Sequence, residues 1–314
     1  MLSIARTELP TTVRVRTPPT LLLGLAVASL VAQVLIVVTG GLVRLTGSGL
    51  GCPTWPQCVD ASYVPTAAYG IHGIIEFGNR MLTFVLALVV LATMLAALLG
   101  GPLRRGIKPL AVALLLGIPA QAVLGGITVL TDLNPWVVTG HFMLSVLLIG
   151  CSTVLVARVR PPRMTAAGGP ALRAYALVLL GLSVAVLYLG TVVTGSGPHA
   201  GDAGAHRTGL SPDRVSQLHA DAVLLLFGLS IGLLVATRLL GAAPVVRTAA
   251  LRVVVVELAN GVIGFVQYFT GLPVVLVAAH MLGACLLVLS VVGLVLSCGT
   301  AVDSTSQREA LRAG

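Results

Sequence analysis

Eight long apolar stretches dominate this sequence and limit the folds that it can adopt. A helix needs about 20 consecutive apolar residues to cross the hydrocarbon core of a bilayer. Eight stretches satisfy this length, at residues 20–40, 72–99, 109–130, 136–157, 174–195, 215–237, 249–269 and 274–298. Only 9% of the residues are charged, whereas a soluble domain has roughly 25%. The sequence therefore predicts an all-α membrane protein with eight transmembrane helices.

The basic residues are distributed unevenly between the two sides of the predicted membrane. Fifteen of the 19 fall on one side, and only Arg44, Arg80, Arg207 and Arg214 fall on the other. The fifteen are Arg6, Arg14, Arg16, Arg104, Arg105, Lys108, Arg158, Arg160, Arg163, Arg173, Arg238, Arg247, Arg252, Arg308 and Arg312. An excess of Lys and Arg in short loops marks the cytoplasmic side, so we expect both termini to lie in the cytoplasm. The membrane is expected to be the plasma membrane. Topology explains the net charge of +9, and no nucleic-acid partner is needed.

The second half of the chain repeats the first. Thr46-Gly47-Ser48-Gly49, after the first stretch, recurs as Thr194-Gly195-Ser196-Gly197 after the fifth. Four further pairs share an offset of 139 residues: Gly125 with Gly264, His141 with His280, Gln121 with Asn260, and Leu133 with Leu272. Each half has an even number of spans, so both have the same orientation, and we expect two four-helix bundles related by a pseudo-two-fold axis along the membrane normal. The predicted organisation is a cytoplasmic segment at 1–19, the halves at 20–158 and 174–298, a linker at 159–173 and a tail at 299–314.

Three histidines lie inside the predicted spans at a similar depth. His141, His219 and His280 are each a few residues from the outer end of an even-numbered span. Ionisable groups in a span are costly, so they face the bundle interior and commonly mark function. One such histidine is equally consistent with a hydrogen bond to a neighbouring helix, but three at one depth favour a functional site. Imidazole is a common axial ligand of haem iron, and facing helices of a bundle are where such ligands lie.

The two halves differ in their candidate ligands. His219 and His280 in the second half predict bis-histidine ligation of a b-type haem. The repeat places Asn79 where His219 has its counterpart, so the first half offers His141 opposite an asparagine. Glu76 lies one turn before Asn79, on the same helix face, and is interpreted as a functional carboxylate rather than a simple interhelical hydrogen-bond partner.

His72 lies one turn before Glu76, and three roles remain open for it. It can ligate iron in place of Asn79, contact a haem propionate, or lie at the water interface. Arg44 and Arg80, near the outer rim, are candidates for pairing with a propionate, with snorkelling to the interface as the equal alternative.

The outer loops contain two further candidates. Cys52 and Cys58 can form a disulfide in an oxidising compartment, as a structural staple or as a redox pair. A later loop carries three potential metal ligands, but their loose spacing favours a plain connecting loop. These are His199, Asp202 and His206. The remaining cysteines, Cys151, Cys285 and Cys298, are expected to be packing residues.

Several of these motifs together resemble those of the haem A synthase family, in its bacterial form with a cysteine pair in the first outer loop. The segments are Gly40–Leu50 followed by Cys52 and Cys58, Glu76-Phe77-Gly78-Asn79-Arg80, Thr139-Gly140-His141, Gln217-Leu218-His219 and the stretch around His280. The resemblance implies an oxidoreductase that converts the C8 methyl group of haem O into the formyl group of haem A, which cytochrome oxidase uses. It also implies haem b on His219 and His280, haem O on His141, and an essential role for Glu76.

The same resemblance implies partners and one open question. Haem O synthase and cytochrome oxidase assembly factors are expected partners, beside membrane lipid. The family pattern commonly reads Glu-x-x-His-Arg, and here Asn79 replaces that histidine. Either His72 substitutes as a ligand or the substrate iron has one open axial position, which we favour. The alternatives to a synthase are a di-haem b membrane electron carrier and a transporter with parallel repeats.

Overall fold

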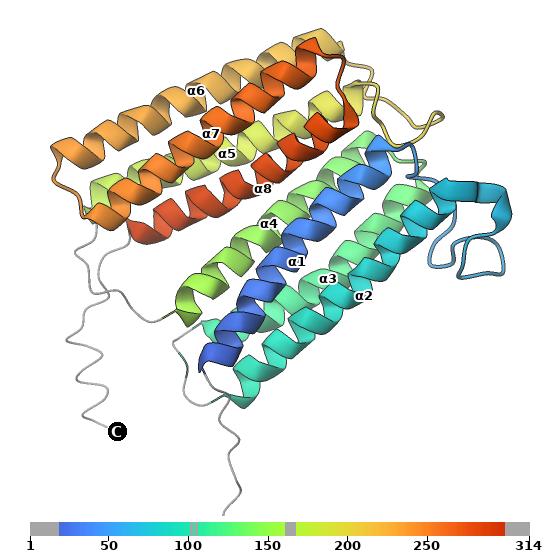
Figure 1. Ribbon diagram of the computed structural model, residues 1–314, viewed down its shortest axis with the longest axis horizontal. Coiled ribbons are helices and arrows are strands. Elements are labelled where there is room, and N and C mark those ends of the chain that lie inside the picture. The colour runs from blue at the N-terminus through green and yellow to red at the C-terminus, as the bar shows by residue number, and fades with distance from the viewer. Residues whose placement is uncertain (1–18, 101–102, 104–105, 161–167, 299–314) are drawn as a thin grey trace, which may run out of the picture.

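The computed structural model describes residues 19–100, 103, 106–160 and 168–298 (Figure 1). It contains eight helices that are long and apolar enough to cross a membrane, and the described residues form no strand. The helices are α1 (Pro19–Leu45), α2 (Gly70–Leu99), α3 (Ile107–Leu130), α4 (Pro135–Val159), α5 (Gly169–Ser196), α6 (Pro212–Leu239), α7 (Pro244–Phe269) and α8 (Val274–Ser297), with a short 3-10 helix, η1 (Ala67–Tyr69), before α2. The predicted all-α, multi-pass membrane fold is confirmed.

Several helices extend beyond the apolar stretches that predicted them. Helix α1 continues past residue 40 to Leu45 and includes Arg44, and α5 begins at Gly169 instead of residue 174 and includes Arg173. A hydropathy pattern detects only the part of a helix that lies in hydrocarbon. Backbone hydrogen bonding continues into the interface, where long basic side chains reach water. The extension of α1 carries Arg44 to the outer loops.

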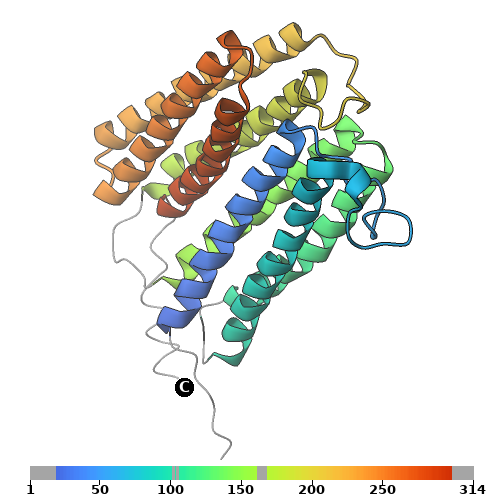
Figure 2. The ribbon, with the colours of Figure 1, turned by 45° about the vertical axis from the view of Figure 1, so that its right-hand side comes forward.

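The helices form two groups of four, α1–α4 and α5–α8 (Figures 1 and 2). In the first group α1 contacts α2 and α4, and α3 contacts the same two helices. In the second group α5 contacts α6 and α8, and α7 contacts the same two helices. The groups meet where α8 packs on α1 and α4, and where α4 packs on α5. The order of neighbours is thus the same in both halves, and the exact pseudo-two-fold relation stays a prediction.

Two turns related by the 139-residue offset have the same backbone conformation. Leu133 follows α3 with φ 58°, and Leu272 follows α7 with φ 60°. Leucine rarely adopts this left-handed region. Each of the two leucines donates its N–H to a carbonyl five residues earlier, at Thr128 and Gln267, in bonds of 2.8 Å. The repeat that the sequence predicts is therefore visible in the local structure of these outer turns.

The three largest buried clusters lie in the first half, in the second half and between the two halves. The first half contains a cluster that includes Leu114 and Leu155, and the second contains one that includes Leu179 and Val291. Between the halves, Ile149 of α4 belongs to a third cluster with residues of α1, α5 and α8. Many large apolar side chains remain exposed along the helices, as expected for surfaces that contact lipid.

Part of the topology prediction concerns residues outside the described ranges. Residues 1–18 of the predicted N-terminal segment, 161–167 of the linker and the whole tail at 299–314 belong to that part. So do eight of the fifteen basic residues, namely Arg6, Arg14, Arg16, Arg104, Arg105, Arg163, Arg308 and Arg312. The cytoplasmic placement of both termini stays a prediction.

Candidate functional site

Two imidazoles meet in the middle of the second helix group. His219 lies near the start of α6 and His280 near the start of α8. Their ring centroids are 6.5 Å apart, with an angle of 76° between the ring planes. Helices α6 and α8 are diagonal in the group and make no direct backbone contact. The two side chains therefore reach toward each other across the bundle interior.

The arrangement of the two imidazoles fits a metal ion whose other ligands do not come from the protein. Two imidazoles bound end-on to one metal at about 2 Å would have ring centroids roughly 6 Å apart. Among the described residues, no group of three or more His, Cys, Asp or Glu side chains is suited to hold a bare metal ion. Haem iron has four ligands from its macrocycle and needs only axial ligands from the protein. The paired histidines therefore fit haem better than a bare ion.

A backbone carbonyl fixes the orientation of one of the two rings. The Nδ1 atom of His280 lies 3.2 Å from the carbonyl oxygen of Asn260 on α7. A carbonyl oxygen can only accept, so Nδ1 carries the hydrogen and donates it. The lone pair of Nε2 is then free for a metal, which is the usual arrangement of a ligating histidine.

Each of the three intramembrane histidines lies against a glycine of the preceding helix. A Cβ atom at Gly125, Gly190 or Gly264 would lie 3.2, 3.3 or 3.2 Å from the Cε1 atom of His141, His219 or His280, respectively. These distances are shorter than ordinary van der Waals contact, so a larger residue would displace the ring. The paired positions Gly125 and Gly264, which the repeat relates, thus make the same contact in both halves.

In the first half, His141 near the start of α4 is the histidine in the corresponding position. Gln121 of α3 donates to the carbonyl oxygen of His141 at 3.2 Å and to the hydroxyl of Ser145 at 2.6 Å. The Nδ1 atom of His141 has no hydrogen-bond partner among the described residues. Asn79 of α2 accepts a hydrogen bond of 2.8 Å from the hydroxyl of Thr39 on α1. The amide that replaces the expected histidine is therefore engaged with α1.

His72 lies at the start of α2, beside the loop that follows α1. It is the third residue of α2, its side chain is exposed, and its Nδ1 atom lies 2.9 Å from the hydroxyl of Ser48. Within the described part of the chain, the one ring contact between histidines joins His219 and His280, and neither His72 nor His141 takes part in it. This placement supports the interface role among the three that the sequence left open.

Glu76 is buried beneath the first outer loop, with 6% of its surface exposed. One carboxylate oxygen accepts a 2.7 Å hydrogen bond from the backbone N–H of Cys52. The other accepts from Arg80, one turn further along α2, and the ion pair measures 2.6 Å. The sequence predicted a buried functional carboxylate here, and the structure adds that it contacts the loop directly.

Arg80 anchors the loop that carries the cysteines. Beside Glu76, its guanidinium donates to the carbonyl oxygens of Cys52, Thr54 and Gln57 at 2.9–3.2 Å. Counting both bonds to Glu76, acceptors within the protein occupy all five N–H donors. Cys52 and Cys58 form a disulfide, which confirms that prediction. The contacts of Arg80 support loop anchoring rather than the propionate pairing considered from the sequence.

Arg44 joins the first half to a loop of the second. Its Nε donates to the carbonyl oxygen of His199 at 2.7 Å, and Nη2 donates to that of Thr194 at 3.2 Å. The ring of His199 in turn donates to the carbonyl oxygen of Leu272 at 3.0 Å. His206 of the same loop is exposed. The segment after α5, interpreted from the sequence as a plain connection, therefore ties three parts of the molecule together.

The sequence interpretation missed a buried carboxylate in the second half. Glu257 of α7 is 6% exposed, and one of its oxygens accepts a 2.9 Å hydrogen bond from the hydroxyl of Ser230 on α6. Its other oxygen has no partner among the described residues. An acidic residue in the middle of an apolar stretch is itself a signal. The repeat search overlooked it because its counterpart at the 139-residue offset is Ile118.

These features define a class, namely multi-pass membrane proteins in which histidines project into the interior of helical bundles. The chain belongs to the cytochrome oxidase assembly protein family (COX15-CtaA), whose family model matches residues 24–292. This match confirms the resemblance found in the sequence motifs.

Curated relatives named heme A synthase are similar to parts of the chain. The protein from Listeria welshimeri serovar 6b is 32% identical over 133 residues, which cover 42% of this chain and 43% of the relative. That from Geobacillus thermodenitrificans is 33% identical over 138 residues, covering 43% and 42%. That from Shewanella oneidensis is 31% identical over 173 residues, covering 50% and 52%. The chain thus matches about half of the length of these relatives.

Proposed function

We propose that this protein is a haem A synthase, which oxidises the C8 methyl group of haem O to the formyl group of haem A for cytochrome oxidase. The observation that carries the proposal is the difference between the two halves. One half has two imidazoles 6.5 Å apart, and the other has His141 with Asn79 turned toward α1. An iron with two imidazole ligands suits electron transfer, whereas an iron with an available position suits chemistry on the molecule that contains it.

The second half, residues 174–298, would hold haem b as a resident cofactor. His219 and His280 would be its axial ligands, and Gly190 and Gly264 leave room for their rings. When bound, haem b would supply a one-electron path to and from the reaction site. The hydrogen bond from His280 to the carbonyl of Asn260 keeps that ring oriented toward the bundle interior.

The first half, residues 20–158, would hold haem O as the substrate. His141 would bind the substrate iron from α4, with its ring against Gly125. Each of two successive hydroxylations of the methyl group would consume one molecule of O2, two electrons that arrive through haem b, and two protons, and would release one molecule of water. The resulting hydrate would lose a further molecule of water to give the formyl group. Asn79 lies on α2, the helix diagonal to α4, and would leave the substrate iron without a second imidazole ligand.

Glu76 would handle protons during the oxidation. It is buried, and it accepts hydrogen bonds from Cys52 and Arg80, which fix its position beneath the outer loop. A carboxylate in this place can exchange protons with the outer aqueous phase along the loop. The disulfide between Cys52 and Cys58 would stabilise this cover over the site.

The proposed setting is the plasma membrane, with both termini in the cytoplasm and the haem sites near the outer face. Haem O synthase would supply the substrate, and cytochrome oxidase assembly factors would receive the product. Lateral entry from the lipid suits a substrate with a long isoprenoid tail, because the tail can remain among apolar helix surfaces.

Expression in a host that makes haem O but not haem A, followed by chromatography of extracted haems, tests the proposal. We expect haem A and haem b from cells that express the wild-type chain. His141→Ala should abolish haem A while haem b is retained, and His206→Ala, a change at an exposed loop histidine, should leave both unchanged. Haem b alone from the wild-type chain would favour a di-haem electron carrier, and a haem-free preparation would favour a transporter.

A further inference from the structure

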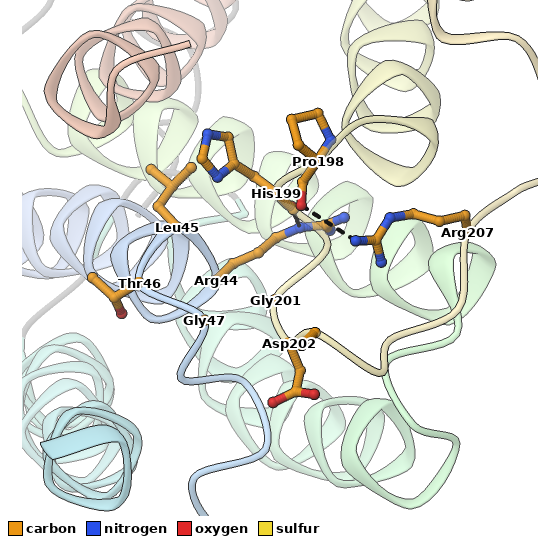
Figure 3. A pocket seen from close by; sticks show the side chains of 10 residues that line it. Arg44, Leu45, Thr46, Gly47, Pro198, His199, Gly201, Asp202 and Arg207 are labelled. Carbon is orange, nitrogen blue, oxygen red and sulfur yellow. Dashed lines mark hydrogen bonds between the residues drawn. The ribbon is translucent and has the colours of Figure 1, made fainter. Parts of the chain in front are cut away.

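A polar pocket of about 320 Å³ lies at the outer surface where the two halves meet. One wall is the end of α1, with Arg44, Leu45 and the two residues that follow. The other wall is the loop after α5, from Pro198 to Arg207 (Figure 3). None of these residues belongs to the haem sites described above. The sequence had suggested Arg44 as a partner of a haem propionate.

Two arginines of this pocket have no carboxylate partner. The guanidinium groups of Arg44 and Arg207 approach the Pro198–His199 backbone from different sides, and each donates to backbone carbonyls (Figure 3). The described residues contain one ion pair with an N–O distance within 4.0 Å, between Glu76 and Arg80, and neither arginine of the pocket takes part in it. The pocket therefore has an excess of positive charge.

The one acidic residue of the pocket is engaged elsewhere. A carboxylate oxygen of Asp202 accepts a 2.8 Å hydrogen bond from the backbone N–H of Gly204. In Figure 3 its side chain points away from both guanidinium groups. It thus leaves the charge of Arg44 and Arg207 without a nearby counter-charge from the protein.

Both arginines retain donors for a ligand. Arg44 uses Nε and one hydrogen of Nη2, and Arg207 uses one hydrogen each of Nη1 and Nη2. A guanidinium has five N–H donors, so each arginine keeps three without an acceptor among the described residues. Guanidinium groups match the two-oxygen geometry of carboxylate and phosphate groups.

The pocket is held in shape by contacts between the halves. Gly201 has φ 109°, a conformation that favours glycine, and its carbonyl oxygen accepts a 2.9 Å hydrogen bond from Gly49 of the first half. A Cβ atom at Gly201 would lie 2.9 Å from a methyl group of Leu133 and 3.5 Å from Cγ of Arg44. A larger residue would therefore displace the wall of the pocket, and the arginine stem with it.

We propose that this pocket binds an oxyanion, a carboxylate or phosphate group, carried by an amphiphilic molecule at the outer membrane surface. The pocket lies where α1 leaves the apolar region, and Leu45 gives it an apolar edge beside the charged donors. The oxyanion can belong to a porphyrin propionate or to a phospholipid headgroup. Binding would offset the cost of holding two positive charges close together. The site does not depend on the proposed enzymatic activity.

Native mass spectrometry of the detergent-purified protein distinguishes the two sources. One probe pair is metal-free protoporphyrin and its dimethyl ester. The ester lacks free carboxylates, and neither compound contains iron, so neither can bind to histidine through a metal. The other pair is phosphatidylglycerol and diacylglycerol, which lacks the phosphate. Arg44→Gln and Arg207→Gln are compared with Arg214→Gln, a matched change at an exposed arginine of α6 outside the pocket.

We expect both pocket variants to weaken binding of one acidic probe by about tenfold or more, with its neutral analogue and the Arg214→Gln protein unaffected. Loss for protoporphyrin identifies a propionate site, and loss for phosphatidylglycerol identifies a lipid site. Binding of both acidic probes equal to wild type in Arg44→Gln and Arg207→Gln overturns the proposal. If these variants do not fold, excess inorganic phosphate must displace an acidic probe from the wild-type protein at matched ionic strength, and absence of displacement overturns the proposal equally.

Discussion

Replacing Gly264 by alanine should weaken haem b binding in the second half, because the added methyl group contacts the ring of His280. The new Cβ atom would lie 3.2 Å from Cε1 of the ring, where ordinary contacts begin at 3.4 Å. The ring is also held by its 3.2 Å hydrogen bond to Asn260, so it cannot move away without loss of that bond. Overpacking of this kind costs about 1–3 kcal/mol. At 1.4 kcal/mol for each tenfold change, this corresponds to roughly 5–150-fold weaker binding.

Gly261→Ala is the matched control. Gly261 lies one turn earlier on α7 and has nothing within 4 Å of its added Cβ atom. Both variants gain the same helix propensity, about 1 kcal/mol, so their difference isolates the contact with His280. The assay is titration of haem b into protein purified from haem-depleted cells, followed by the Soret band. Equal affinities of Gly264→Ala and Gly261→Ala would refute the assignment of the ring as a haem ligand held against this glycine.

Three further predictions concern the first half. Glu76→Gln keeps the shape of the side chain but removes its charge and proton-transfer capacity, so haem A formation should fall about 100-fold or more with haem b content unchanged; normal conversion would exclude the proton-handling role. Replacing Cys52 and Cys58 together by serine should destabilise the outer loop by about 2 kcal/mol, because the bond closes a short loop, and an unchanged midpoint of thermal unfolding would contradict this. Asn79→His should raise the low-spin fraction of bound haem O by offering a second imidazole opposite His141, and an unchanged spectrum would show that position 79 does not face the iron.

The sequence was sufficient to predict the helices and the placement of the three histidines near the starts of α4, α6 and α8, because both follow from one-dimensional patterns. Eight apolar stretches became eight helices, and the 139-residue offset identified the matching turns at Leu133 and Leu272. The same offset related Gly125 to Gly264, which make equivalent contacts with His141 and His280. The offset predicts contacts here because residues at equivalent positions of two equivalent helices lie at the same height and point in the same direction.

The contacts of the arginines could not be predicted in the same way. Arg44 and Arg80 donate mainly to backbone carbonyls of loops, at His199 and Thr54 for example. Every residue has a carbonyl group, so the sequence does not indicate which one a guanidinium will meet. Loop conformation decides this, and it depends on tertiary packing. Glu257 was missed for a different reason. The site was predicted from positions that recur in both halves, and this carboxylate occurs in one half only.

In the proposed arrangement, one half binds its haem between two imidazoles and the other half binds its haem through one. Electron paramagnetic resonance of the ferric protein, with haem b and haem O bound, measures this directly. We expect one low-spin species that disappears in His219→Ala and in His280→Ala, together with a second species that disappears only in His141→Ala and lacks bis-imidazole character. Two bis-imidazole species in the wild-type protein, or a bis-imidazole species that persists without His219 and His280, would rule this arrangement out.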